Sequence, residues 1–392
     1  MNLDARRLAG KAWDSWLSSD DQAPGRARRP LDRIFGGLVR DAKASAVTSS
    51  EGWSRVTAAA RFAGYLAARN DLAAWTAATD PRAEIARIPD FWPAVERLMA
   101  DPLPPERAKW RQGDPAEQVA AAGVHPAWTA PLLDRFGDAL WKFLVPLDTA
   151  PPLWVRVRRE EELPSVETAL RADGFKVNHG PGLALRVRGE RPVHFATSFT
   201  EGAIEIQDLA SQRVIDALPP GAPVWDACAG EGGKTLALAS RLRGKSSVSA
   251  SDLYPNRIEA LKKRVKRSGW QNVRTFAWDG TAKPSLPREA SAGFPLVLVD
   301  APCSASGTWR RNPEVRLQPP AGEELLALQA QILRHAAEAV RAGGALALAT
   351  CSVDRRENEA QLEALGWPVE QSGLFGSPGE DADTLILGVA RR

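Results

Sequence analysis

Two cysteines in the second half of the chain are placed to act together. Cys303 follows the apolar run that ends at Asp300, in the order Asp-Ala-Pro-Cys-Ser, and Cys351 ends the next apolar run, in Ala-Thr-Cys-Ser. If those runs are neighbouring strands, both thiols reach one crevice beside a carboxylate. A thiolate is a soft nucleophile, so this grouping favours attack on an electrophilic ring carbon. We interpret the remaining cysteine, Cys228, as an inert buried residue, the usual state of a lone cysteine.

Aspartates end further apolar runs of the same region. Asp252 and Asp279 each close a run, as Asp300 does. In an open α/β sheet, ligands bind outside the carboxyl ends of the strands, so these acids should line one crevice. Asp252 suits a pair of ribose hydroxyls and Asp279 an adenine amino group, because ionised carboxylates accept hydrogen bonds. Each alone could equally cap the following helix. Together they favour a nucleoside-type cofactor.

A glycine-rich turn comes directly after the buried run Val224 to Cys228. Residues 229–235 read Ala-Gly-Glu-Gly-Gly-Lys-Thr, and a helical stretch follows them. Such a strand-to-helix turn lets a ligand approach the backbone beside the amide donors of a helix N-terminus. A phosphate-binding P-loop would need a glycine where Cys228 stands, so an ATPase is excluded. By itself the turn is a weak signal, and a tight connection without a ligand is the less favoured alternative.

These residues need a sheet whose strands end at a common edge. After about Thr200, short apolar runs alternate with helical stretches, which predicts a mostly parallel, doubly wound sheet. The expected strands lie in residues 222–229, 246–252, 273–279, 295–300, 345–352 and 384–391.

The first half of the chain has a different pattern of apolar residues. A chain of 392 residues is also longer than one hydrophobic core usually organises, so we expect more than one domain. Residues 1–122 should form an all-α domain, residues 123–200 a small α+β domain, and residues 201–392 the doubly wound domain. Within the small domain, residues 151–159 alternate as a strand, 163–174 form a helix, and 182–189 and 192–198 form a strand-like pair.

Composition excludes several classes of protein. With 44% apolar and 25% charged residues, the chain is neither disordered, collagen-like nor a coiled coil. It has no apolar run of about 18 residues and a charged start without an apolar h-region, which predicts a soluble cytoplasmic protein. The cysteines and histidines are too scattered for a metal site. We expect a metal-free monomer that does not bind a membrane.

Basic residues leave the question of nucleic acid open. The net charge is +3, and of 51 basic residues 40 are arginine, whose planar fork suits phosphates and base edges. A GC-rich genome explains the same excess equally well. The basic segments Gly25–Arg40 and Lys262–Arg267 could face RNA phosphates or be solvated helix faces, and we favour the solvated face for the first.

Taken in order, segments of the second half resemble the RNA 5-methylcytosine methyltransferases, the Sun or RsmB-like group. The pairing of Pro-Cys-Ser with Thr-Cys-Ser is specific, because the DNA enzymes place their nucleophile in a Pro-Cys element and lack the second. The matching segments are EGAIEIQDLASQ (201–212), DACAGEGGKT (226–235), SDLYPNR (251–257), WDGT (278–281), DAPCSASGTWRRNPEVR (300–316) and ATCSVDRRENE (349–359).

The resemblance implies a class I methyltransferase with a Rossmann-like sheet and S-adenosylmethionine as methyl donor. The turn would hold the amino-acid part of the cofactor, Asp252 its ribose and Asp279 its adenine. The residues implied in binding this cofactor are Ala229, Gly230, Glu231, Gly232, Gly233, Lys234, Asp252, Arg257, Asp279 and Asp300.

The same resemblance implies the catalytic roles. Cys351 would add to carbon 6 of cytosine, Asp300 would hold the ring, and Cys303 would assist removal of the carbon 5 proton and release of the enzyme. Lys234 would point into the same pocket. The base must be unstacked to be reached. The RNA backbone would be anchored by Arg310, Arg311 and Arg316.

The sequence departs from the family pattern at several positions. Glu231 replaces a usual proline, and this puts cofactor affinity in question. Ala305-Ser306-Gly307 replaces Gly-Thr-Gly, and Asp383-Thr384-Leu385-Ile386 replaces Asp-Gly-Phe-Phe. None of these removes a catalytic side chain.

The first 120 residues loosely resemble a NusB-like helical domain, which points to 16S ribosomal RNA or a small-subunit particle as the substrate. Two competing interpretations remain. One is the same chemistry on transfer RNA, and the other is a non-catalytic RNA-binding or ribosome-assembly protein that keeps the methyltransferase fold.

Overall fold

The computed structural model describes residues 4–19, 31–42, 46–78 and 80–392. The chain divides into two compact units, Met1–Thr149 with Trp309–Pro320, and Ala150–Thr308 with Ala321–Arg392. This division differs from the three expected segments, because residues up to 149 and the late segment 309–320 belong with the N-terminal unit. Of the basic segment Gly25–Arg40, residues 25–30 lie outside the described residues.

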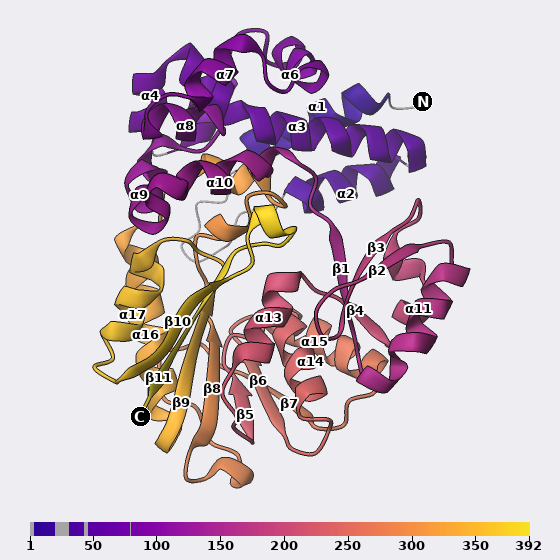
Figure 1. Ribbon diagram of the computed structural model, residues 1–392, viewed down its shortest axis with the longest axis vertical. Coiled ribbons are helices and arrows are strands. Elements are labelled where there is room, and N and C mark those ends of the chain that lie inside the picture. The colour runs from indigo at the N-terminus through magenta and orange to yellow at the C-terminus, as the bar shows by residue number, and fades with distance from the viewer. Residues whose placement is uncertain (1–3, 20–30, 43–45, 79) are drawn as a thin grey trace. The chain divides into compact units, whose positions relative to one another are not determined.

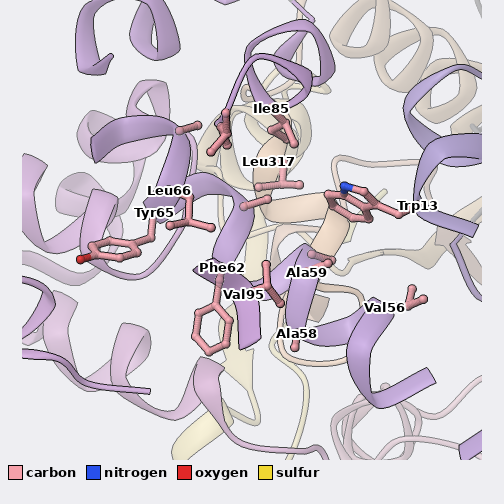
Figure 2. Packing of buried hydrophobic residues seen from close by; sticks show 14 of the residues in the cluster. Trp13, Val56, Ala58, Ala59, Phe62, Tyr65, Leu66, Ile85, Val95 and Leu317 are labelled. Atoms are coloured by element: carbon pink, nitrogen blue, oxygen red, sulfur yellow. The ribbon is translucent and has the colours of Figure 1, made fainter. Parts of the chain in front are cut away.

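The N-terminal unit is built from helices. Its longest helix, α3, buries Val56, Ala60, Ala63 and Ala67 along one face, at the spacing of a 3.6-residue period. Leu317, from the late segment, lies in the same cluster of buried side chains as Trp13, as Figure 2 shows. The helices of this unit are α1 (Ala5–Leu17), α2 (Leu31–Ala42), α3 (Ala46–Asn70), α4 (Leu72–Ala77), α5 (Pro81–Ala86), α6 (Phe91–Ala100), α7 (Pro105–Arg111), α8 (Pro115–Ala121), α9 (Thr129–Phe136) and α10 (Leu140–Leu144).

A small antiparallel sheet begins the second unit, with strand order β2-β3-β1-β4. Its central strand β1 alternates between two surroundings: Val155 and Val157 pack in the small core, whereas Trp154 packs in the core of the large sheet. The two sheets therefore share one compact unit. The elements here are β1 (Leu153–Val157), α11 (Leu163–Ala172), β2 (Lys176–His179), β3 (Ala184–Arg188), α12 (Thr197–Thr200) and β4 (Ile204–Ile206).

The prediction of a strand over residues 192–198 is wrong. Val193–Phe195 form a 3-10 turn and α12 begins at Thr197. The backbone amides here are used locally, because Phe195 donates to the Pro192 carbonyl and Thr197 to Asp173 Oδ2. The strands that complete the small sheet, β2 and β4, are short and were not expected from the sequence.

The large sheet has the strand order β10-β11-β9-β8-β5-β6-β7 and is parallel from β9 to β7 (Figure 1). This confirms the expected doubly wound α/β fold. Strand β10, antiparallel to β11, was not expected. The elements are α13 (Leu209–Ala217), β5 (Val224–Asp226), α14 (Gly233–Arg241), β6 (Val248–Asp252), α15 (Pro255–Ser268), β7 (Val273–Ala277), β8 (Phe294–Asp300), α16 (Glu323–Glu338), β9 (Val340–Thr350), α17 (Glu359–Glu363), β10 (Val369–Phe375) and β11 (Leu385–Arg391).

Both faces of this sheet are buried, as the continuous apolar runs of its strands predict. On β8, Leu296 and Leu298 pack with residues of α13 and α14, whereas Val297 and Val299 pack on the opposite face with Ile332 of α16. Successive side chains of a strand point to opposite faces of the sheet, so the apolar residues of β8 are divided between two hydrophobic cores.

The order of the strands reverses between β5 and β8. The chain runs outward from β5 through β6 to β7 and then returns to form β8 on the other side of β5. Crevices at the carboxyl ends of strands on either side of such a reversal are where ligands bind in open α/β sheets. Asp226, at the end of β5, and Asp300, at the end of β8, stand at this reversal.

No helix in the described ranges is long and apolar enough to cross a membrane. Within the same ranges, no group of His, Cys, Asp and Glu side chains has the arrangement of a metal site.

Candidate active site

The glycine turn after β5 leaves open space above its backbone. Gly230 has a φ of +56° and Gly232 a φ of +91°, conformations that glycine adopts without a steric penalty. A Cβ at Gly230 or Gly233 would meet nothing within 4 Å, whereas one at Gly232 would lie 2.1 Å from Leu261. The turn therefore packs against α15 on one side and is open to a ligand on the other.

Asp252 connects this turn to the end of β6. Its Oδ2 accepts the N–H of Gly230 at 2.9 Å and its Oδ1 accepts the N–H of Tyr254 at 2.9 Å. The residue is only 5% exposed, and Arg257 Nη1 lies 3.6 Å from Oδ2. Each carboxylate oxygen has a second lone pair, so Asp252 can still accept a hydroxyl while it holds the turn.

Lys234, in the first turn of α14, reaches the end of β8. Its Nζ donates to Asp300 Oδ2 at 2.7 Å. Burial opposes the positive charge of Lys234, but Asp300 and Cys351 outweigh it and raise the pKa of this amine.

The structure brings Cys303 and Cys351 together. They follow adjacent parallel strands, β8 and β9, and their Sγ atoms lie 3.3 Å apart. The hydrogen bond with Cys351, together with burial, raises the pKa of Cys303 well above its ordinary value. Cys303 therefore keeps its proton, whereas Cys351 interacts electrostatically with the Lys234 ammonium, so the two thiols are not equivalent.

Cys228, which follows β5 directly before the glycine turn, has surroundings that differ from those of the other two cysteines. Burial raises its pKa, and the carboxylates of Asp300, Asp226 and Asp252 raise it further. Its thiol is thus protonated and weakly nucleophilic, in keeping with our interpretation of an inert residue.

Two acidic residues of the site were missed in the sequence. Asp226 ends β5 as the other aspartates end their strands, so the same signal could have found it. Thr235 Oγ1 donates to Asp226 Oδ2 at 2.6 Å, and burial raises the pKa of this carboxyl to about 7. The other, Glu357, is fully buried and accepts hydrogen bonds from residues beside both cysteines. No spacing rule connects it to Cys303, which lies in the loop after β8, far away in sequence.

Comparison with known proteins finds a family that is similar to the part of the chain that carries this site. Residues 216–373 match the family described as "16S rRNA methyltransferase RsmB/F". This segment holds β5, the glycine turn and both cysteines.

The curated relatives carry corresponding names. "Ribosomal RNA small subunit methyltransferase B" of Xanthomonas campestris pv. campestris is 36% identical over 267 residues, which cover 66% of this chain and 60% of that protein. "Probable ribosomal RNA small subunit methyltransferase B" of Bacillus subtilis is 30% identical over 259 residues, 64% of this chain and 58% of that protein. The match thus spans about three fifths of the length of these relatives.

Solved structures confirm the methyltransferase fold. One matches the whole of both chains with a TM-score of 0.73 at 20% identity. A methyltransferase homologue from Pyrococcus horikoshii covers 74% of this chain and 100% of its own, with a TM-score of 0.58 at 21% identity.

Two further residues expected to hold a cofactor, Asp279 and Glu231, follow β7 and β5 of the large sheet. Asp279 is exposed, and its Oδ1 accepts the N–H and Oγ1–H of Thr281, which lowers its pKa. A ligand would meet its other oxygen. Glu231 is exposed, and its carbonyl accepts from Arg264 Nη1 at 2.9 Å.

The arginines expected to hold RNA belong to the N-terminal unit. Arg316 is 0% exposed and donates to the carbonyls of Ala122, Leu147 and Trp309, and burial lowers its pKa to about 9. Arg310 is also buried and donates to the Thr149 carbonyl. These guanidinium groups hold the backbone of their own unit, so we withdraw Arg316 and Arg310 as RNA contacts and keep the half-buried Arg311.

The basic helix Lys262–Arg267 is engaged within the protein. Arg264 and Arg267 both bind the carboxylate of Glu205 on β4, with N···O distances of 2.9 and 2.5 Å. Two of the positive charges of this segment, those of Arg264 and Arg267, are therefore paired within the protein. The sequence had suggested RNA or solvent as their partners.

Proposed function

We propose that this protein transfers a methyl group from S-adenosylmethionine to carbon 5 of a cytosine in RNA. The observation that carries the proposal is the pair of thiols at 3.3 Å, one of which, Cys351, interacts electrostatically with the Lys234 ammonium. Cytosine needs a nucleophile at carbon 6 before carbon 5 can accept a methyl group, and a positioned thiolate is suited to that addition.

The open turn fits this cofactor. The missing side chains at Gly230 and Gly233 leave room for a ligand beside the N-terminus of α14, and Asp252 has lone pairs for the ribose hydroxyls. When bound, the cofactor supplies an electrophilic methyl group. The residues that would hold it are Ala229, Gly230, Glu231, Gly232, Gly233, Lys234, Asp252, Arg257, Asp279 and Asp300.

Cys351 is the nucleophile in this proposal. Its thiolate, stabilised by the ammonium of Lys234, adds to carbon 6 and leaves carbon 5 electron-rich. Asp300 accepts from the exocyclic amine of the base with the oxygen that Lys234 does not use. A ring in a duplex hides these atoms, so the cytosine must be flipped out or come from a single-stranded loop.

Cys303 completes the reaction. It holds its proton in the free enzyme because it is bonded to Cys351. Once Cys351 forms a bond to carbon, that sulfur loses its negative charge, so Cys303 ionises more easily. Cys303 can then take the proton from carbon 5, and the electron pair left behind expels Cys351 from carbon 6.

For the substrate, we propose small-subunit ribosomal RNA. The support is that the curated relatives are named as methyltransferases of that RNA. Arg311, close in sequence after Cys303, is the remaining candidate for a phosphate contact.

Bisulfite sequencing of total RNA tests the proposal, because 5-methylcytosine resists conversion. Cells that lack the gene should lose protection at a cytosine of small-subunit ribosomal RNA, and the wild-type gene but not Cys351→Ala should restore it. Loss at a transfer RNA would move the substrate to that class. Unchanged protection everywhere would overturn the reaction and leave a non-catalytic RNA-binding role.

A further inference from the structure

A buried carboxylate lies between the two cysteine segments. Glu357, at the end of the 3-10 turn Arg355–Glu357, is 0% exposed. Its Oε1 accepts from Ser304 Oγ at 2.6 Å and from Ser352 Oγ at 2.5 Å. Its Oε2 accepts the N–H of Ser304 at 2.8 Å and Gln329 Nε2 at 3.1 Å. One side chain thus satisfies four donors.

The two serines are the residues directly after the cysteines. Ser304 follows Cys303 beyond β8, and Ser352 follows Cys351 beyond β9. Their hydroxyl oxygens lie 3.0 Å apart. A group that fixes both serines also fixes the backbone that carries each thiol, although the strands themselves end before the cysteines.

The chain that supplies Glu357 is itself held in place. Asn358 Nδ2 donates to the carbonyls of Ser352 at 2.9 Å and Asp354 at 2.7 Å, and Asn358 Oδ1 accepts from Thr350. These bonds close the loop between β9 and α17, so Glu357 is directed toward the serines by its neighbour.

A carboxylate is the group that this position requires. It is acceptor-only when ionised, and charge-assisted hydrogen bonds are stronger than neutral ones. A glutamine would offer one acceptor oxygen, and its amide would have to face either Gln329 and the Ser304 N–H, which are donors, or the hydroxyls, which can rotate to accept. A buried charge is tolerated only when its hydrogen bonds are complete.

We propose that Glu357 is a positioning residue for the thiol pair. By accepting from Ser304 and Ser352 it holds Cys303 and Cys351 in contact, without touching a substrate. An effect of Glu357 on methyl transfer rests on the proposed function. Its effect on the contact between the two thiols does not. The inference therefore has a test that needs neither RNA nor cofactor.

The first test measures how readily the thiols pair. Wild type, Glu357→Gln and Glu357→Leu are oxidised with diamide, which takes two electrons and two protons from the pair as the disulfide forms. The rate of Cys303–Cys351 linkage, read by peptide mass spectrometry, is divided by the rate of alkylation with iodoacetamide. This ratio corrects for changes in thiol ionisation, since the Glu357 charge raises the pKa of Cys303 after the larger effects of Cys351 and burial.

We expect the ratio of disulfide formation to alkylation to fall at least about tenfold in Glu357→Leu. It should fall less in Glu357→Gln, because the amide keeps some of the hydrogen bonds of the carboxylate. Glu363→Gln is the matched control, because it removes an exposed carboxylate on nearby α17. Its ratio should equal that of wild type. Ser304→Ala and Ser352→Ala each remove a hydroxyl that donates to Glu357 Oε1, and they are the alternative if thermal melting shows that Glu357→Leu does not fold.

The second test measures methyl transfer. In Glu357→Gln, kcat should fall about tenfold while KM for RNA and cofactor stays within about twofold, and the loss should be non-additive with Ser352→Ala. A disulfide ratio equal to wild type in Glu357→Gln and in both serine variants would overturn the positioning role. A reduced ratio in a protein whose wild type methylates no RNA would support the positioning role and overturn the proposed function instead.

Discussion

Lys234 Nζ lies 2.7 Å from Asp300 Oδ2, which joins the first turn of α14 to the end of β8. This contact crosses the point where the strand order reverses, between β5 and β8. It places a buried cation beside both a candidate ring-binding carboxylate and the candidate nucleophile Cys351. A single charge therefore influences both halves of the proposed chemistry.

Lys234→Met should lower kcat for methyl transfer by at least about 100-fold, because the thiolate loses its counter-charge in a site where charges interact strongly. Alkylation of Cys351 by iodoacetamide at neutral pH should slow in parallel. Lys245→Met removes an exposed lysine and should match wild type in both measurements. Unchanged alkylation of Cys351 in Lys234→Met would contradict this role.

Replacement of Cys351 and replacement of Cys303 should block the methylation reaction at different steps. Cys351→Ala should abolish methyl transfer without weakening RNA binding, because no adduct at carbon 6 can form. Cys303→Ala should accumulate a covalent RNA–protein adduct that survives a denaturing gel, because release is impaired. Residual turnover by Cys351→Ala would remove it as the nucleophile, and a Cys303→Ala protein without adduct would leave Cys303 a structural role.

The buried Asp226 should make stability depend on pH. Its folded-state pKa is about 7, against 3.8 for an ordinary aspartate, so the folded protein binds a proton that the unfolded chain has lost. This contribution is complete below about pH 4 and is lost as pH rises toward 7. Urea unfolding should show wild type losing up to about 2 kcal/mol relative to Asp226→Asn between pH 5 and 7. Parallel pH profiles would show that Asp226 is ionised in the fold.

Arg316 should contribute to folding and not to RNA affinity. Its guanidinium donates to three buried carbonyls in its own unit, so Arg316→Met leaves these acceptors without partners. Loss of at least about 3 kcal/mol in the free energy of unfolding is expected. Arg311→Met, at a half-buried neighbour, should reduce the salt dependence of RNA binding. A stable Arg316→Met protein with weak RNA binding would reverse this assignment.

Ala305 has a φ of +57°, a left-handed conformation that a residue with a Cβ rarely adopts. Ala305→Gly should relieve strain of about 1–2 kcal/mol but add unfolded-state entropy of up to about 1 kcal/mol, for a net gain near 0.5 kcal/mol. Thermal melting measures this gain. Gly343→Ala, also at positive φ but remote from the cysteines, should destabilise the protein instead.

The sequence by itself was sufficient for the doubly wound sheet and for most of its strands. Continuous apolar runs that alternate with helical stretches predict strands of a parallel sheet whose two faces are both covered by helices. Each such run, for example Pro295–Asp300, predicts one strand. The same logic predicted that Asp252, Asp300 and the cysteines would lie at one edge, because the carboxyl ends of parallel strands share an edge. Strand β10 and the short strands β2 and β4 have patterns too brief or too polar to be read in this way.

Only the tertiary structure decided which of these residues meet. The 3.3 Å between Cys303 and Cys351 depends on β8 lying beside β9, and neighbouring strands in a sheet are not specified by sequence spacing. Arg316 resembled a surface cation, yet the segment 309–320 belongs to the helical unit and buries it. Glu357 gave no signal at all, because its partners Ser304 and Ser352 lie in the loops that follow two different strands. Local pattern reports which face of an element is apolar, whereas burial and partner choice for a charged side chain depend on chain segments far away in sequence.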